Sequence, residues 1–170
     1  MEETLKLNLG SNTVRMEGFK NVDIRDIPEV DIVDDVSTLE KIEDNSCDFI
    51  VANAILEHFS PDRIDDILKV WYRKLQDGGT LEIGVPDGEL IFDRYLNQAG
   101  YKGDWAKLVH SLFGNIQILR GWHGKDAELY GHHMLFCKSY LRSKMEDLGL
   151  KDIKDIPPDH PDCFSLSGIK

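Results

Sequence analysis

A strand-like segment, a helix-like segment and a second strand-like segment follow one another within residues 49–86. Phe49–Ala54 is largely apolar, as expected of a strand covered on both faces. The next segment repeats apolar residues every three or four positions, which is the period of one helix face: Ile64, Ile67, Leu68, Trp71 and Leu75. Beyond a glycine pair, apolar residues alternate as in a strand: Leu81, Ile83 and Val85. This order predicts two parallel strands joined by a crossover helix, and so an α/β protein.

Capping residues mark the predicted helices. Ser60 is expected to cap the crossover helix. Asp104 is expected to cap a second helix, Trp105–Phe113, and its apolar period predicts that this helix packs into the core. Ser139 is expected to cap a third helix, which Gly149 ends.

Further strands are predicted on both sides of the crossover unit. Three lie near the start of the chain: Leu5–Leu9, Asn21–Ile24 and Val30–Val33. Two more lie at the end, Lys151–Ile156 and Phe164–Ile169, and a proline-rich turn between them makes the pair antiparallel.

Length and charge restrict the domain count and the partners. A chain of 170 residues fits a single domain, taken here as 1–170. The net charge of -11 argues against nucleic acid and membrane surfaces as partners, since both are anionic. The three cysteines, Cys47, Cys137 and Cys163, are far apart and odd in number, which is typical of reduced thiols. With no apolar run long enough to span a bilayer, we expect a cytoplasmic protein.

Gly10 and Asp23 are the first candidates for a binding site. Gly10 follows the first predicted strand, and Asp23 stands near the end of the second. In open α/β sheets a glycine turn at one strand tip and a carboxylate at the next commonly hold a nucleoside. Asp23 could also be an ordinary residue of a strand-end turn, but its register with Gly10 favours the ribose-binding role.

Six short motifs, in order and in register, resemble those of small class I S-adenosylmethionine-dependent methyltransferases: Leu7-Asn8-Leu9-Gly10, Asn21-Val22-Asp23, Cys47-Asp48-Phe49-Ile50, Leu56-Glu57-His58, Leu75–Leu81 and Val85-Pro86. The resemblance implies a doubly wound, Rossmann-like, seven-stranded sheet that is mostly parallel, with an antiparallel last strand. Residues 10–18 leave room for at most one helical turn in the first crossover. A helical insertion is expected after the fifth strand, at about residues 100–133.

The resemblance also implies a set of residues that bind the cofactor, S-adenosylmethionine. Gly10 would lie against its methionine portion, together with Leu9 and Ser11. The carboxylate of Asp23 would accept hydrogen bonds from both ribose hydroxyls. The remaining implied contacts are Ile24 on the adenine ring, Asp35 and Val36 at the adenine amino group, and Asn53 at the amino-acid group.

Histidines are the candidates for acid–base catalysis. An oxygen acceptor needs a base, and the candidates are His58, His132, His133 and Asp87, whereas a nitrogen acceptor can react without one. His58 could equally be a loop residue before the helix. His132 and His133, with His123 and Asp126, could suggest a metal site, but they show no metal-binding spacing, so no metal is expected and a solvated or substrate-facing loop is favoured.

The resulting function hypothesis is a methyltransferase that acts on a small-molecule substrate, with a sugar-linked acceptor suggested by the resemblance alone. A homodimer is one arrangement considered. The alternative is a non-enzymatic methyltransferase-like protein that binds a nucleoside or a protein partner. A nucleotide-sugar or dinucleotide enzyme is disfavoured, because the full G-x-G-x-x-G loop is absent.

Overall fold

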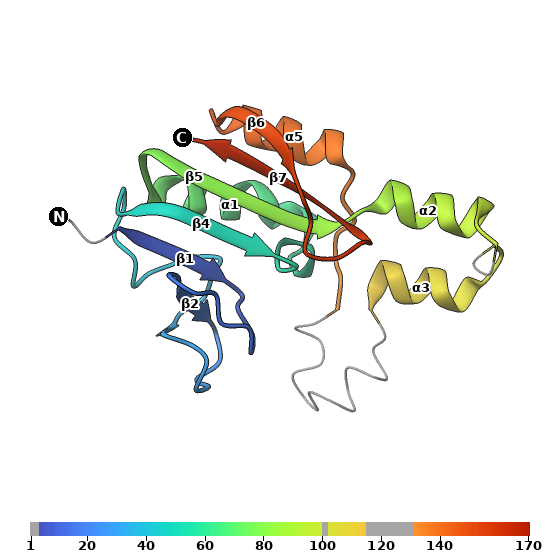
Figure 1. The fold of residues 1–170 in the computed structure, drawn as a ribbon, viewed down its shortest axis with the longest axis horizontal. Helices are drawn as coiled ribbons and strands as arrows, with labels where there is room; N and C mark the ends of the chain where they lie inside the picture. Colours follow the sequence, from blue (N-terminus) through green and yellow to red (C-terminus); the bar gives the residue numbers. More distant parts are fainter. Residues whose placement is uncertain (1–3, 100–101, 115–130) are drawn as a thin grey trace.

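The computed structural model describes residues 4–99, 102–114 and 131–170, and its seven strands form one sheet (Figure 1). The strand order is β3-β2-β1-β4-β5-β7-β6. The strands are β1 (Leu5–Leu9), β2 (Lys20–Asp23), β3 (Ile32–Val33), β4 (Cys47–Asn53), β5 (Leu75–Pro86), β6 (Lys151–Ile156) and β7 (Cys163–Ile169). β7 runs antiparallel to both of its neighbours, β5 and β6, and the other neighbouring strands of the sheet pair in parallel. The predicted fold class, a mostly parallel Rossmann-like sheet with an antiparallel last strand, is confirmed.

Two helices, α1 (Ile64–Lys74) and α5 (Lys138–Asp147), contribute to the same hydrophobic core. The apolar face of α1 contributes Ile64, Ile67, Leu68 and Trp71, all at most 1% exposed. These side chains pack with the strand residues that point the same way, among them Leu7, Ile50 and Ile83. The Nε1–H of Trp71 donates a hydrogen bond to the carbonyl of Val36 at 2.7 Å, so the largest core side chain has its polar atom satisfied.

The alternate residues of the central strands, which point to the opposite face of the sheet, are more polar. They include Asn8, Glu82, Ser165 and Ser167, of which only Glu82 is more than slightly exposed. The crossover from β1 to β2, residues 10–19, is a loop without a helix, which agrees with the expectation of at most one helical turn. This loop contributes Phe19, whose ring packs edge-on against Phe49 of β4 at 5.6 Å.

The helices α2 (Gly88–Asn97) and α3 (Trp105–Phe113) form an arm beyond the end of β5 (Figure 1). The predicted cap of α3 is confirmed, because the side chain of Asp104 accepts a hydrogen bond from the Lys107 N–H. The prediction that α3 packs into the core is wrong: Trp105 is 66% exposed and Phe113 59%, and only Leu108 is buried. Among the described helices and strands, α3 packs mainly against α2, which leaves part of its apolar face exposed.

Two predicted caps differ in the structure. A short 3-10 helix, η2 (Pro61–Arg63), precedes α1, and the Ser60 hydroxyl donates to the Asp62 carboxylate instead of capping backbone N–H groups. The helix α5 begins at Lys138, one residue before the predicted cap Ser139, and its N-cap is Cys137. Gly149 ends α5 as predicted, with a φ of +94° that favours glycine.

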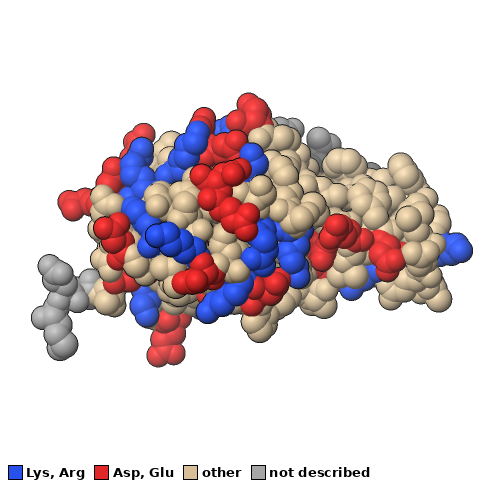
Figure 2. All heavy atoms as spheres, turned by 90° about the horizontal axis from the view of Figure 1, so that it is seen from above, with Lys and Arg blue, Asp and Glu red and all other residues tan. Residues whose placement is uncertain are grey.

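The surface view in Figure 2 shows acidic and basic side chains interspersed over the body of the molecule, with fewer charges toward the arm. The arm instead exposes apolar side chains from both of its helices: Phe92, Leu96, Trp105 and Phe113. Within the described part of the chain, no helix has the length and apolar character needed to cross a membrane.

Candidate cofactor and acceptor site

The sheet reverses its winding direction between β1 and β4, and ligands of open α/β sheets bind at such a switch point. The loop after β1 turns sharply there. Gly10 has a φ of +64°, and the N–H groups of Gly10 and Ser11 both donate to the carbonyl of Val22, at 2.9 and 3.2 Å. These bonds fasten the loop to β2. The hydroxyl of Ser11 is buried and has no hydrogen-bond partner among the described residues, so it is free to bind a polar ligand group.

Only glycine fits at position 10. Its positive φ is unfavourable for other residues, and a Cβ placed there would stand 2.7 Å from Cδ1 of Ile55, well inside van der Waals contact. Ile55 follows the tip of β4, so the loop after β1 and the segment after β4 are in close contact.

Asp23 lies at the tip of β2, beside this loop, and is 7% exposed. One carboxylate oxygen accepts a hydrogen bond from the Asn12 N–H at 2.9 Å. The other accepts from the backbone N–H and from Nε of Arg25, both at 3.0 Å. Burial raises the pKa of Asp23, but the hydrogen bonds from Arg25 and Asn12 outweigh it, and the net pKa is lowered. Asp23 is therefore a charged acceptor, and Arg25 already engages it.

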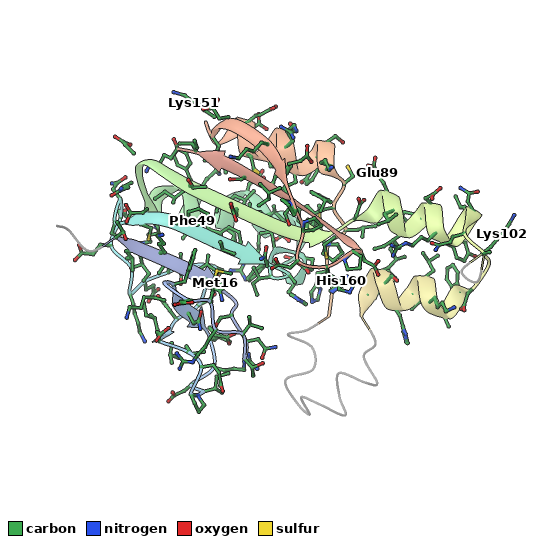
Figure 3. The ribbon with its side chains drawn as sticks, viewed as in Figure 1. Met16, Phe49, Glu89, Lys102, Lys151 and His160 are labelled. Carbon is green, nitrogen blue, oxygen red and sulfur yellow. The ribbon has the colours of Figure 1, made fainter. Side chains whose placement is uncertain are left out.

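The other predicted cofactor residues are distributed around this edge and do not form one cluster. Leu9 is buried in the core, and Ile24 is 58% exposed. Asp35 is exposed, while the side chain of Val36 is buried in the core, which leaves only its backbone N–H for an adenine contact. The Nδ2 of Asn53 donates to the carboxylate of Asp159, in the loop joining β6 and β7. Figure 3 labels His160 of this loop, close to the tips of β4 and β5.

Two of the predicted histidines meet on the other side of the switch point. His58, in the short helix η1 (Leu56–His58), and His132 have ring centroids 5.3 Å apart in an edge-on arrangement. The Nδ1 of His58 lies 3.1 Å from the carbonyl of Gly131. Burial lowers the pKa of His58 to about 4 and also lowers the pKa of His132, so both rings are neutral near pH 7.

The remaining candidate bases lie elsewhere. His133 is exposed, and its backbone N–H donates to the carbonyl of Glu57 at 2.8 Å. Asp87 caps α2, where its carboxylate accepts from the N–H groups of Glu89 and Leu90. His123 and Asp126 fall outside the described residues.

Glu57 is a site residue that the sequence reasoning missed. It is 1% exposed, its Oε2 has no hydrogen-bond partner within the described ranges, and burial raises its pKa to about 7. One carboxylate oxygen of Glu57 lies within 4.8 Å of a ring nitrogen of His58 and of His132. The sequence did contain one indication of this role: Glu57 stands among the apolar residues Ile55, Leu56 and Phe59, where an unpaired charge is unfavourable.

This geometry agrees with the requirements of S-adenosylmethionine. A buried hydroxyl without a partner in the described ranges lies in the loop after β1, and a charged acceptor lies at the tip of the adjacent strand. The ribose hydroxyls can hydrogen-bond to Asp23 by replacing part of its contact with Arg25. The residues present therefore fit the cofactor.

The comparisons with known proteins agree with the geometry. Residues 10–83 match the family model described as "Methyltransferase domain". No curated protein matches the sequence significantly. Among solved structures, a SAM-dependent methyltransferase from Archaeoglobus fulgidus is similar, with a TM-score of 0.63 and 14% identity, over 99% of this chain and 87% of that one.

Two other similar structures are also methyltransferases. A SAM-dependent methyltransferase from Thermotoga maritima has a TM-score of 0.60 and 17% identity, over 100% of this chain and 84% of that one. The 1,6-didemethyltoxoflavin-N1-methyltransferase of Burkholderia thailandensis, solved with its substrate and S-adenosylhomocysteine, has a TM-score of 0.59 and 14% identity, over 98% and 72%. Part of the chain, residues 10–83, thus matches the methyltransferase-domain family, and the chain as a whole has the fold of these S-adenosylmethionine-dependent enzymes.

Proposed function

We propose that this protein is an S-adenosylmethionine-dependent methyltransferase that acts on a small, uncharged and polar acceptor, of which a sugar-linked hydroxyl is the example we favour. The observation that carries the proposal is that the chain has both a buried, charged acceptor at the tip of β2, Asp23, and two half-buried neutral histidines in contact with each other, His58 and His132. The toxoflavin-precursor enzyme among the similar structures supports a small-molecule acceptor.

The charges around the acceptor side support a neutral acceptor. Cys163, at the start of β7, has its pKa raised to about 11 by burial and by four nearby acids: Glu57, Asp162, Asp159 and Asp87. Arg94, the cation paired with Asp162, neutralises only one of them. Such surroundings repel phosphate groups, so a phosphorylated acceptor and nucleic acid are disfavoured.

Bound cofactor supplies a methyl group that its sulfonium makes electrophilic, and the role of the protein is to position the two reactants. Ser11 and the backbone around Gly10 would hold the amino-acid end, and Asp23 the ribose. Alignment of donor and acceptor can account for roughly 7–11 kcal/mol of the barrier. A neutral His58 or His132 can also accept the proton of a hydroxyl acceptor, a contribution of about 10²–10⁴-fold, while the exposed His133 would contact the acceptor from the rim.

The exposed apolar side chains of the arm support the homodimer. Phe92 and Leu96 of α2 and Trp105 and Phe113 of α3 are all at least 45% exposed, and two copies that pair through them would bury this surface. The three cysteines are free thiols, which supports a reducing compartment such as the cytoplasm.

Calorimetric titration with S-adenosylmethionine and S-adenosylhomocysteine tests the proposal. We expect Asp23→Ala to weaken binding by about 10–100-fold, because hydrogen bonds to a charged group contribute about 1.5–3 kcal/mol. Asp26→Ala is the matched control, since Asp26 is an exposed acid three residues away. If the two variants bind the cofactor with equal affinity, Asp23 is not part of the binding site.

A non-enzymatic methyltransferase-like protein is the second candidate, and its protein-binding form is favoured by the contact of Arg25 with Asp23, which occupies the acceptor that a ribose would need. Absence of heat and of a thermal shift at millimolar cofactor would support this candidate and contradict methyl transfer.

A further inference from the structure

Glu57, His58 and His132 form a cluster of three side chains that can bind a metal ion. One ligand atom from each lies within 4.8 Å of the other two. Ligands bound about 2.0–2.2 Å from one ion in a tetrahedral site are about 3.3–3.5 Å apart. From separations of at most 4.8 Å, the three atoms would have to approach one another by no more than about 1.5 Å to bind a common ion.

The strongest evidence is the state of the Glu57 carboxylate. Its Oε2 is buried and lacks a hydrogen-bond partner in the described part of the chain, and no ion pair is formed by Glu57 there. A buried carboxylate without a partner is costly, and buried charges in proteins are typically paired or bound to a metal. A cation bound beside Oε2 of Glu57 would therefore stabilise the buried carboxylate.

Both histidine rings are neutral near pH 7, as metal binding requires. The Nδ1 of His58 lies 3.1 Å from the carbonyl of Gly131, and in the tautomer with its proton on Nδ1 the lone pair of Nε2 can bind an ion. Metal-binding histidines commonly donate their second ring N–H to a backbone carbonyl in this way, since that fixes the tautomer and the ring orientation. The edge-on contact of His58 with His132 brings the second imidazole alongside.

Backbone hydrogen bonds hold the two contributing segments together. The carbonyl of Glu57 accepts from the N–H groups of His133 and Met134, at 2.8 and 3.1 Å, and the His132 N–H donates to Phe113 at 3.3 Å. The ligands thus come from two segments that are more than seventy residues apart in the sequence and that backbone hydrogen bonds already hold side by side. This arrangement reduces the cost of assembling a site.

We propose that Glu57, His58 and His132 bind one divalent transition-metal ion, with Zn²⁺ as the probe. Two imidazoles and one carboxylate suit Zn²⁺ and its first-row neighbours, whereas Mg²⁺ and Ca²⁺ prefer oxygen ligands. Three protein ligands leave one coordination position open, as in catalytic zinc sites. A bound ion would use the ring lone pairs of His58 and His132, so in that state these residues are ligands and not bases. A function of the open position toward the methyl acceptor rests on the proposed methyl transfer, but the binding of the ion does not. The proposal replaces the expectation from sequence that no metal binds.

Calorimetric titration of the chelator-treated protein with ZnCl₂, without cofactor, tests the site. We expect one equivalent to bind, and His132→Ala and Glu57→Gln to weaken binding by at least about 100-fold, because loss of a mere supporting partner already costs about 10–100-fold. The control is His110→Ala, because His110 is exposed on α3 and outside the cluster. Far-ultraviolet circular dichroism confirms that each variant is folded.

A second measurement uses thermal unfolding. With free zinc at about 100 times Kd, the melting temperature of the native sequence should rise by about 5–10 °C, and that of His132→Ala should not change. Failure to bind one equivalent, an equal loss in His110→Ala, or Mg²⁺ binding as tight as Zn²⁺ would overturn the proposal. Zinc binding in a protein that does not bind S-adenosylmethionine would support the metal site and contradict only the methyl transfer.

Discussion

The two halves of the site differ in how their buried acids are satisfied. On the β1–β2 side, Asp23 accepts hydrogen bonds from Asn12 and Arg25, and its pKa is lowered. On the β4 side, Glu57 has an oxygen without a partner in the described residues, and burial raises its pKa to about 7. The acid of the first half is thus satisfied within the chain, whereas the acid of the second half has an oxygen that no described residue satisfies. The comparison suggests that the first half is preformed and that a ligand completes the second.

The largest expected effect comes from breaking the preformed half at Gly10. Gly10→Ala should lower the free energy of unfolding by about 3 kcal/mol, since it combines an unfavourable positive φ with overpacking against Ile55. Urea denaturation measures this loss. The double variant Gly10→Ala/Ile55→Ala removes the contact but not the backbone strain, so strain alone accounts for whatever loss remains beyond that of Ile55→Ala.

A matched pair of carboxylate-to-amide substitutions tests the comparison directly. Asp23→Asn should lower the free energy of unfolding by about 2 kcal/mol, because charge-assisted hydrogen bonds from Arg25 and Asn12 are weakened. Because the folded pKa is below the ordinary value of 3.8, the stabilisation is present above that value and is lost as the pH falls through the folded pKa. The Asp23→Asn variant should therefore not show the loss of unfolding free energy that protonation of Asp23 causes at low pH. A pH profile identical to that of the native sequence would contradict the role of Asp23.

Glu57→Gln is the other member of the pair and should have the smallest effect, with the opposite sign. In metal-free protein it should raise the free energy of unfolding by about 1 kcal/mol, because a neutral amide is less costly to bury than a carboxylate without a partner. Chemical denaturation in the presence of a chelator measures the change. A loss as large as that of Asp23→Asn would mean that the two halves do not differ.

Most of the fold could be predicted from the sequence, because the spacing of apolar residues along the chain indicates which side chains are buried. The alternation Leu81, Ile83, Val85 correctly predicted a strand, and all three side chains are fully buried. The same signal failed at Trp105 and Phe113, because an apolar face has the same period whether or not the chain supplies something to cover it.

For the site, spacing predicted which residues lie near the strand tips but not how their side chains are paired. Asp23 was correctly placed beside the Gly10 loop, yet its contact with Arg25 was not foreseen. The meeting of His58 with His132 depends on how the chain returns from the arm, and no local pattern encodes that path. Glu57 was missed because a single acid in an apolar run indicates burial only after the fold is known.

The helix-free crossovers near the start of the chain have a consequence for local stability. Loops connect β2 to β1 and to the edge strand β3, and β3 has only two residues, so few backbone hydrogen bonds anchor this edge of the sheet. Such regions open at a lower free energy than the centre of a sheet. A nucleoside bound at Asp23 would connect the edge to the loop after β1, and amide protons of residues 20–33 should then exchange more slowly in its presence.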